Sequence, residues 1–239
     1  MYQPERFCIL PERNSMQKTT LLLSFILLLL MGNSCRKRIP PPDNLGTTGN
    51  YQPTTAGSTW SYQVRGTSNY DHTMRAEDRD SLINGIPYRV ISSNKDPYIY
   101  HLKDGGNYHR FSRQPEFNFQ PVEFIYLRDY LAAGQEWEEV KTIKVKVAGI
   151  DVNVTAFMKI KIVERGIDYT VNGVTYKNVI HLEMKPEFRA LLTTIGSTSD
   201  IHYYYAENVG MIYNKSVLKI PTADVDINKD TWLVAYSIQ

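Results

Sequence analysis

Residues 142–162 read TIKVKVAGIDVNVTAFMKIKI, and this stretch decides the fold class. Its first part places Ile143, Val145 and Val147 at alternate positions, with lysines between them. The second part repeats the alternation, with apolar residues at every even position from 152 to 162 and mostly polar residues between them. A period of two is typical of a strand with one buried and one wet face. The stretch therefore predicts an antiparallel β-hairpin in an all-β protein.

The same stretch also predicts how its two strands pair. A turn centred on Gly149 and Ile150 places Val147 opposite Val152, and the pairs further along the hairpin are also apolar on the same face. A slip of one residue would move every side chain to the other face. We therefore expect Val145 to pair with Val154.

Two Asn-Gly pairs, at 84–85 and 172–173, predict two further hairpins, because a type I′ turn needs positive φ at both central residues. The second hairpin would pair Tyr169 with Tyr176. Residues 122–133 are ambiguous, with room for one helical turn. The sequence predicts a single, mostly antiparallel all-β domain, with other strands near 59–64, 75–83, 86–92, 98–102, 107–111, 167–171, 174–184, 201–206, 210–217 and 231–238.

The N-terminal region contains an apolar run, LLLSFILLLLM, at residues 21–31. As a helix it would span roughly 17 Å, which is too short for a bilayer core of about 30 Å. With Lys18 ahead of it, the run is typical of a signal peptide, which we assign to residues 1–34. Residues 1–15 carry Glu5 and Glu12 ahead of this positive charge. We therefore predict that the working signal begins at Met16.

Three residues, Gly-Asn-Ser at 32–34, separate Cys35 from the apolar run, and we predict that diacylglycerol modifies this cysteine. The chain has two cysteines, Cys8 and Cys35, so no intramolecular disulfide remains after processing. MGNSC resembles a lipobox, in which a small residue precedes the modified cysteine, although Gly32 stands where leucine is usual. A free thiol is the alternative. Residues 35–57 are rich in Pro, Gly, Thr and Asn, which predicts a tether, and residues 58–239 form the expected domain.

Charge and motifs exclude several functions. The chain has 27 basic and 25 acidic side chains, without the concentrated basic face that a nucleic-acid partner needs. It has no Gly-x-Ser-x-Gly, no phosphate-binding glycine loop and no His-Glu-x-x-His. We expect no enzyme activity, no catalytic residue and no cofactor. Carboxylate groups near residues 77–80 and 136–139 leave a carbohydrate-active enzyme as a lesser alternative.

The histidines offer one possible metal pair, His101 and His109. A three-residue loop over 104–106 would bring them together, whereas a two-residue loop would place them on opposite faces. Zinc would still need another ligand, so we expect no metal site. His181 alternates with Glu183 and Lys185, which predicts a place on the wet face of its strand.

Tyrosine is abundant, with 17 residues. Strand propensity and core filling explain such an abundance. The alternative is an aromatic surface that binds sugar or lipid. Several of the tyrosines cluster in expected strands, namely Tyr98, Tyr100, Tyr108, Tyr203, Tyr204 and Tyr205.

A weak internal repeat divides the domain. Gly-x-x-Trp occurs at 57–60 and 134–137, and each copy is followed by an Asn-Gly-x-x-Tyr segment, at 84–88 and 172–176. Either the two halves share a structural duplication, or Asn-Gly hairpins recur by chance.

These motifs, with Tyr-Tyr-Ala-x-x-Val-Gly at 204–210, resemble Gram-negative bacterial lipoproteins that have no assigned activity. The resemblance covers roughly residues 58–239. It implies a curved antiparallel sheet, similar to the half-barrel of lipoprotein carriers, and it implies no activity.

From these observations we expect a non-catalytic lipoprotein of the cell envelope that binds a hydrophobic ligand or an envelope protein. A structural or assembly component without a small ligand is the alternative. The lipid would anchor the protein to a membrane. We expect the protein on the periplasmic side of the outer membrane. An internal apolar cavity would favour the ligand, whereas a filled core with an exposed apolar patch would favour a protein partner.

Overall fold

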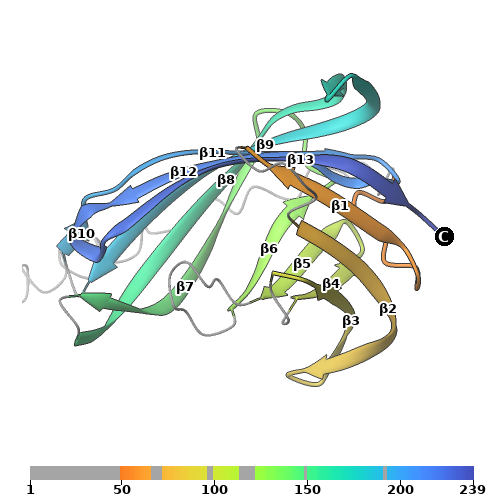
Figure 1. The fold of residues 1–239 in the computed structure, drawn as a ribbon. Coiled ribbons are helices and arrows are strands. Elements are labelled where there is room, and N and C mark those ends of the chain that lie inside the picture. The colour runs from red at the N-terminus through yellow and green to blue at the C-terminus, as the bar shows by residue number, and fades with distance from the viewer. Residues whose placement is uncertain (1–48, 66–71, 96–98, 113–121, 148–149, 191–192) are drawn as a thin grey trace, which may run out of the picture. The chain divides into compact units, whose positions relative to one another are not determined.

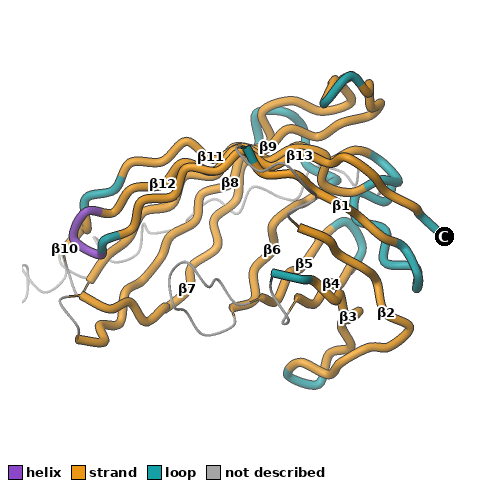
Figure 2. The backbone as a smooth tube through the Cα atoms, viewed as in Figure 1, coloured by secondary structure: helices purple, strands orange, loops and turns teal. Residues whose placement is uncertain are grey.

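The computed structural model describes residues 49–65, 72–95, 99–112, 122–147, 150–190 and 193–239. The predicted signal peptide (residues 1–34), Cys35, residues 36–48 and Tyr98 lie outside these ranges. Almost all described residues belong to strands of one antiparallel sheet, and a 3₁₀ turn at Pro221–Ala223 is the helical segment seen in Figure 2. The predicted all-β fold with a curved sheet is confirmed.

Thirteen strands form the sheet. Each strand expected from the sequence is present, and several run longer than expected. In chain order they are β1 (Thr59–Val64), β2 (His72–Ile83), β3 (Ile86–Ser93), β4 (Ile99–Asp104), β5 (Asn107–Ser112), β6 (Val122–Arg128), β7 (Glu136–Val147), β8 (Ile150–Val171), β9 (Val174–Ala190), β10 (Thr193–Ile195), β11 (Thr198–Ala206), β12 (Gly210–Ile220) and β13 (Val225–Ser237).

The ambiguous segment 122–133 contains a strand, because Val122–Arg128 forms β6. A register shift in the β5–β6 ladder interrupts the alternation there. As a result Tyr126 and Leu127, which are consecutive, are both buried. A bulge of this kind hides the period of two on which the prediction depended.

Strand order shows an up-and-down meander (Figure 1). The order is β6-β5-β4-β3-β2-β1-β13-β12-β11-β9-β8-β7, and β10 pairs with β9 at the side. The first strand, β1, therefore pairs with the last, β13, while the consecutive strands β6 and β7 form the two edges. Side chains link these edges, since the indole N–H of Trp137 donates to the Ile125 carbonyl at 3.1 Å. The sheet thus curls until its edges come within reach of each other.

The β7–β8 hairpin has the predicted faces but a different register. Val147 pairs with Ile150 and Ile143 with Val154, whereas the prediction placed Val154 opposite Val145. The chain reverses over two residues instead of four, which shifts the partners by two. Because side chains alternate with a period of two, the buried face is unchanged, and Ile143 and Val154 both lie in the core.

Both Asn-Gly hairpins form as predicted. Tyr169 pairs with Tyr176, and Ile83 pairs with Ile86. At the tip of the β8–β9 hairpin, Asn172 has φ 49° and Gly173 has φ 78°, as the type I′ turn requires.

The two Gly-x-x-Trp segments share the same backbone structure. Gly57 and Gly134 both have φ 87°. The N–H of Gly57 donates to the Ala76 carbonyl, and that of Gly134 to the Ile162 carbonyl, at 2.8 Å in both cases. In each copy the N–H of the same partner residue donates to the carbonyl of the residue after the glycine, at 2.9 Å. The tryptophan is buried in both copies. These matching contacts support a duplication of the β1–β3 and β7–β9 units.

The core fills the inner face of the curved sheet, which we define by residues such as Leu182, Tyr205 and Leu218. The rings of Tyr126 and Tyr205, from different parts of the sheet, lie 5.4 Å apart across this interior. Residues ahead of β1 also join the core: Tyr51 is 3% exposed, and its N–H donates to the hydroxyl of Tyr108 at 3.1 Å. The folded part thus includes residues that the sequence analysis placed in the tether.

Candidate functional site: an aromatic cleft on the outer face

A row of side chains crosses the outer face, which is opposite the core around Leu182. Part of this row packs against a second buried cluster, which includes Val171 and Tyr176 of the β8–β9 hairpin. Cross-strand pairing places Tyr204 of β11 between His181 of β9 and Tyr213 of β12, and Tyr213 beside Trp232 of β13. Directly paired residues share a face and lie in contact distance. We call these four residues the aromatic row. They come from four strands, and the strand register brings them together.

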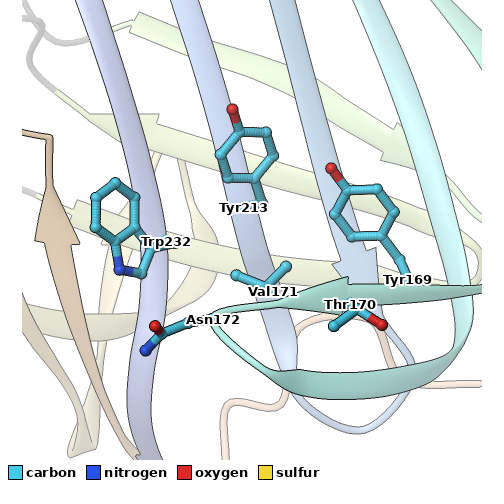
Figure 3. Close-up of a pocket in the computed structure, with 6 residues that line it drawn as sticks. All are labelled: Tyr169, Thr170, Val171, Asn172, Tyr213 and Trp232. Atoms are coloured by element: carbon cyan, nitrogen blue, oxygen red, sulfur yellow. The ribbon is translucent and has the colours of Figure 1, made fainter.

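The tip of the β8–β9 hairpin lies over this row. The ring of Tyr169 stacks on Tyr204 at 4.0 Å and lies 6.3 Å from the ring of Tyr213. Strand β8 has three register shifts before its tip, between residues 162 and 169. Bulges bend a strand and increase its twist, which explains why the tip leaves the plane of the sheet and passes in front of β12 toward Trp232 of β13 in Figure 3.

Between the hairpin tip and the row lies a cavity of about 230 Å³, the aromatic cleft (Figure 3). The hairpin contributes one wall, and strands β12 and β13 contribute the other. The lining residues are Tyr169, Thr170, Val171, Asn172, Tyr213 and Trp232.

The polar groups around the cleft are fixed by local contacts. The hydroxyl of Tyr213 donates to Asp230 Oδ1 at 3.2 Å, and Asp230 forms an ion pair with Arg65. Burial and the neighbouring carboxylate raise the pKa of Tyr213 to about 12, so this hydroxyl stays protonated. The Thr170 hydroxyl is 2.9 Å from that of Thr175. None of the six lining side chains is charged.

A chain of hydrogen bonds extends from the other end of the row. His181 Nδ1 is 2.9 Å from Glu164 Oε2, and His181 Nε2 is 2.9 Å from His202 Nδ1. His202 Nε2 is in turn 2.9 Å from Asp200 Oδ1. Burial lowers the pKa of His181, although the Glu164 carboxylate acts against this effect.

The expectation that His181 is a wet-face residue is wrong. Its alternation with Glu183 does place it opposite the core, but its exposure is only 7%. The ring of Tyr204 stacks on it at 4.2 Å. Alternation therefore predicted the face correctly, but Tyr204 shields the imidazole of His181 from water.

His101 and His109 do not meet. Asp104 pairs with Asn107, so the loop has two residues and the histidines point to opposite faces. His101 faces the core, with Nδ1 3.3 Å from the Tyr126 hydroxyl, and burial together with the Arg110 charge lowers its pKa to about 3. Among the described residues, no cluster of three or more His, Cys, Asp or Glu is placed to hold a metal.

The carboxylate groups singled out in the sequence form ion pairs on the sheet surface. Asp80 pairs with Arg89 at 2.9 Å, and Glu136 pairs with Lys159 at 3.1 Å. These contacts are typical of solvent-exposed ion pairs on the surface of a sheet.

The tyrosine cluster divides between the two faces. Tyr108, Tyr203 and Tyr205 pack into the core, while Tyr204 joins the aromatic row. Sequence reasoning missed the three aromatic residues that line the cleft. The register of the β11–β12 and β12–β13 pairs is the signal that could have found two of them; the third depends on the bend in β8. The cleft residues missed in this way are Tyr169, Tyr213 and Trp232.

No family model matches the chain, and no curated protein matches it in sequence. A solved structure of a candidate lipoprotein from Parabacteroides distasonis is similar, with 11% identity and a TM-score of 0.49. The match covers 79% of this chain and 99% of that one. In the part of the chain that the structure describes, no helix is long and apolar enough to cross a membrane.

Proposed function

We propose that this chain is a non-catalytic lipoprotein of the cell envelope, anchored through Cys35, which binds a ligand in its aromatic cleft. One observation carries the binding role. Three partly exposed aromatic side chains, Tyr169, Tyr213 and Trp232, converge on one cavity from separate strands. Convergent aromatic rings with a few polar groups are the usual lining of a ligand site.

The interior supports this placement of the ligand on the outer face. Contact between Tyr126 and Tyr205 fills the space between opposite parts of the sheet. Buried Leu127 and Leu182 belong to the same core. A hydrophobic ligand held inside the curved sheet, as in a carrier, would have to displace these side chains.

The chemistry of the lining supports binding without catalysis. The cleft presents aromatic rings with two phenol hydroxyls, one amide and one threonine hydroxyl that is already paired with another threonine. Hydrolysis would need a nucleophile beside a base, or two carboxylates at a set separation. The lining carries neither arrangement.

The anchor follows from the sequence. A short apolar run ends at Met31, shortly before Cys35, and residues 36–38 are Arg-Lys-Arg. Basic residues next to a lipid anchor attract anionic head groups by about 1 kcal/mol each. We place the protein on the periplasmic side of the outer membrane.

An envelope component that binds another protein is a second candidate. Leu82 is 74% exposed and Ile86 is 46% exposed at the tip of the β2–β3 hairpin. Exposed apolar side chains that lie together on a surface are typical of a protein contact. Loss of a co-purified protein in Leu82→Ser, without change in Trp232→Ala, would favour this candidate.

The test uses the full chain expressed in a Gram-negative host. Mass spectrometry of its N-terminal peptide should show a diacylglyceryl group on Cys35, and Cys35→Ser should leave the membrane fraction or remain unprocessed. Compounds that co-purify with the wild-type chain should be lost from Trp232→Ala and kept in Tyr236→Ala. Tyr236 is a matched control, because it is 46% exposed on the same strand and lies outside the cleft. An unmodified Cys35, or identical compounds on all variants, would contradict the proposal.

A further inference from the structure

We propose, resting on the proposed function, that the aromatic cleft binds one ring of an uncharged saccharide, stacked on Trp232 and Tyr213. Four features of the cleft lead to this class of ligand: an unengaged indole, the combination of apolar faces with polar rims, the absence of charge and the size.

Trp232 differs from the other two tryptophans of the chain. The indole N–H groups of Trp60 and Trp137 donate to the carbonyls of Val209 and Ile125, at 2.6 and 3.1 Å. Among the described residues, Trp232 has neither such a bond nor one of the ring contacts that join Tyr169, Tyr204 and Tyr213. It is partly exposed where it lines the cleft. Trp60 and Trp137 are therefore explained by packing, whereas Trp232 packs against the neighbouring buried residues with only part of its ring and leaves the rest of the ring and its N–H to the cleft.

The cleft combines apolar faces with a polar rim. An aromatic ring has an apolar face, and the Trp N–H and Tyr O–H add polar edges. Asn172 lies beside Trp232 at the rim in Figure 3, and its amide can both donate and accept. A saccharide ring has the complementary form, because its C–H groups form flat apolar faces and its hydroxyls surround them.

Charge excludes an anionic ligand. The lining has no lysine or arginine, and the nearby Arg65 is already paired with Asp230. A phosphate or carboxylate is normally bound by charge-assisted hydrogen bonds, for which this cleft has no free cation in its lining. An uncharged ligand therefore fits best.

Size points the same way. Small-molecule sites usually occupy about 300–1,000 Å³, and the cleft, at about 230 Å³, lies below this range. It has room for one small ring, whereas an acyl chain would need a longer apolar channel. The rest of an oligosaccharide would lie in solvent along the outer face.

Tryptophan fluorescence tests the inference with the detergent-solubilised full chain. The probes are neutral hexasaccharides of glucose in α-1,4 and β-1,4 linkage, of mannose, of xylose and of N-acetylglucosamine. Because Trp60 and Trp137 are buried, a saturable change in emission on titration should come from Trp232. At least one hexasaccharide should give this change. Calorimetry should show that Trp232→Ala weakens its binding by roughly tenfold or more, and that Tyr236→Ala leaves it unchanged.

A second variant keeps the test valid if Trp232→Ala unfolds. Asn172→Gly removes the rim amide, and glycine accepts the positive φ of this turn position without strain. It should keep the melting temperature within a few degrees and weaken saccharide binding. Three results would overturn the inference: no hexasaccharide binds, binding survives both variants, or phosphatidylglycerol vesicles bind in a manner that requires Trp232. A lipidated chain that binds no saccharide counts against this inference alone, whereas saccharide binding by an unlipidated chain counts against the anchor alone.

Discussion

Acid should destabilise this protein through the imidazole of His101. This side chain is 5% exposed, and burial with the Arg110 charge lowers its pKa to about 3. In the unfolded chain a histidine titrates near pH 6.5. The folded-state pKa is therefore the lower one, so the stabilisation is fully present above about pH 6.5 and is lost as the pH falls toward 3.

The size of the effect follows from these two values. At about pH 4.5 the unfolded chain takes up the proton almost completely, while the folded state hardly does, and this difference lowers the free energy of unfolding by about 3 kcal/mol relative to about pH 7.5. Urea unfolding of the full chain, followed by tryptophan fluorescence, gives this quantity at both pH values.

His101→Gln provides the comparison, because glutamine does not titrate. The pH-dependent loss in wild type should exceed the loss in His101→Gln by about 3 kcal/mol. Taking the difference between the two proteins cancels groups such as Asp129, whose pKa is raised by burial and which acts in the opposite direction. Equal losses in both proteins would show that His101 is not the group that titrates, and the reasoning would be refuted.

Four other predictions concern three substitutions and one shortened chain. Gly173→Val should cost about 1–3 kcal/mol of stability, because valine does not tolerate φ 78°; a thermal melt equal to wild type would contradict the turn. Val154→Asp should cost at least about 3 kcal/mol by urea unfolding, because it buries an unpaired carboxylate, and a smaller cost would argue against the assigned inner face. His181→Gln should cost about 1–2 kcal/mol through broken contacts to Glu164 and His202, whereas no change would mean that this chain of bonds is not formed in solution. A chain that starts at Met16 should be exported and lipidated as well as the full chain, as judged by fractionation, and loss of export would show that residues 1–15 are needed.

The sequence was sufficient for features that depend on local pattern. Alternating side chains in β7 and β8 predicted which residues are buried, and Asn172-Gly173 predicted both the turn and the pairing of Tyr169 with Tyr176. Strand β6 was missed because a bulge places two consecutive residues in the core. Register within β7–β8 was wrong by two residues, since every pairing of the same parity matches apolar with apolar.

The cleft could not be predicted from local pattern. Tyr213 and Trp232 are neighbours only because β12 and β13 pair in one particular register. Tyr169 reaches them only because irregular pairing bends β8. Tyr169 also lies more than 40 residues ahead of Tyr213 in the sequence, so no single window of sequence contains the site.

The pairing of the first strand with the last sets the order in which this fold can be completed. Thr59 pairs with Ser237, and the backbone N–H of Gln239 donates to Ser58 Oγ at 3.2 Å. Neighbouring strands elsewhere in the meander can form hairpins early in folding. Contacts between segments that are distant in sequence form more slowly. A chain that leaves a translocation channel N-terminus first would expose one free edge of β1 until β13 arrives, and an unpaired edge invites aggregation. Such a chain would need to keep the free edge of β1 from pairing with other chains until β13 has left the channel.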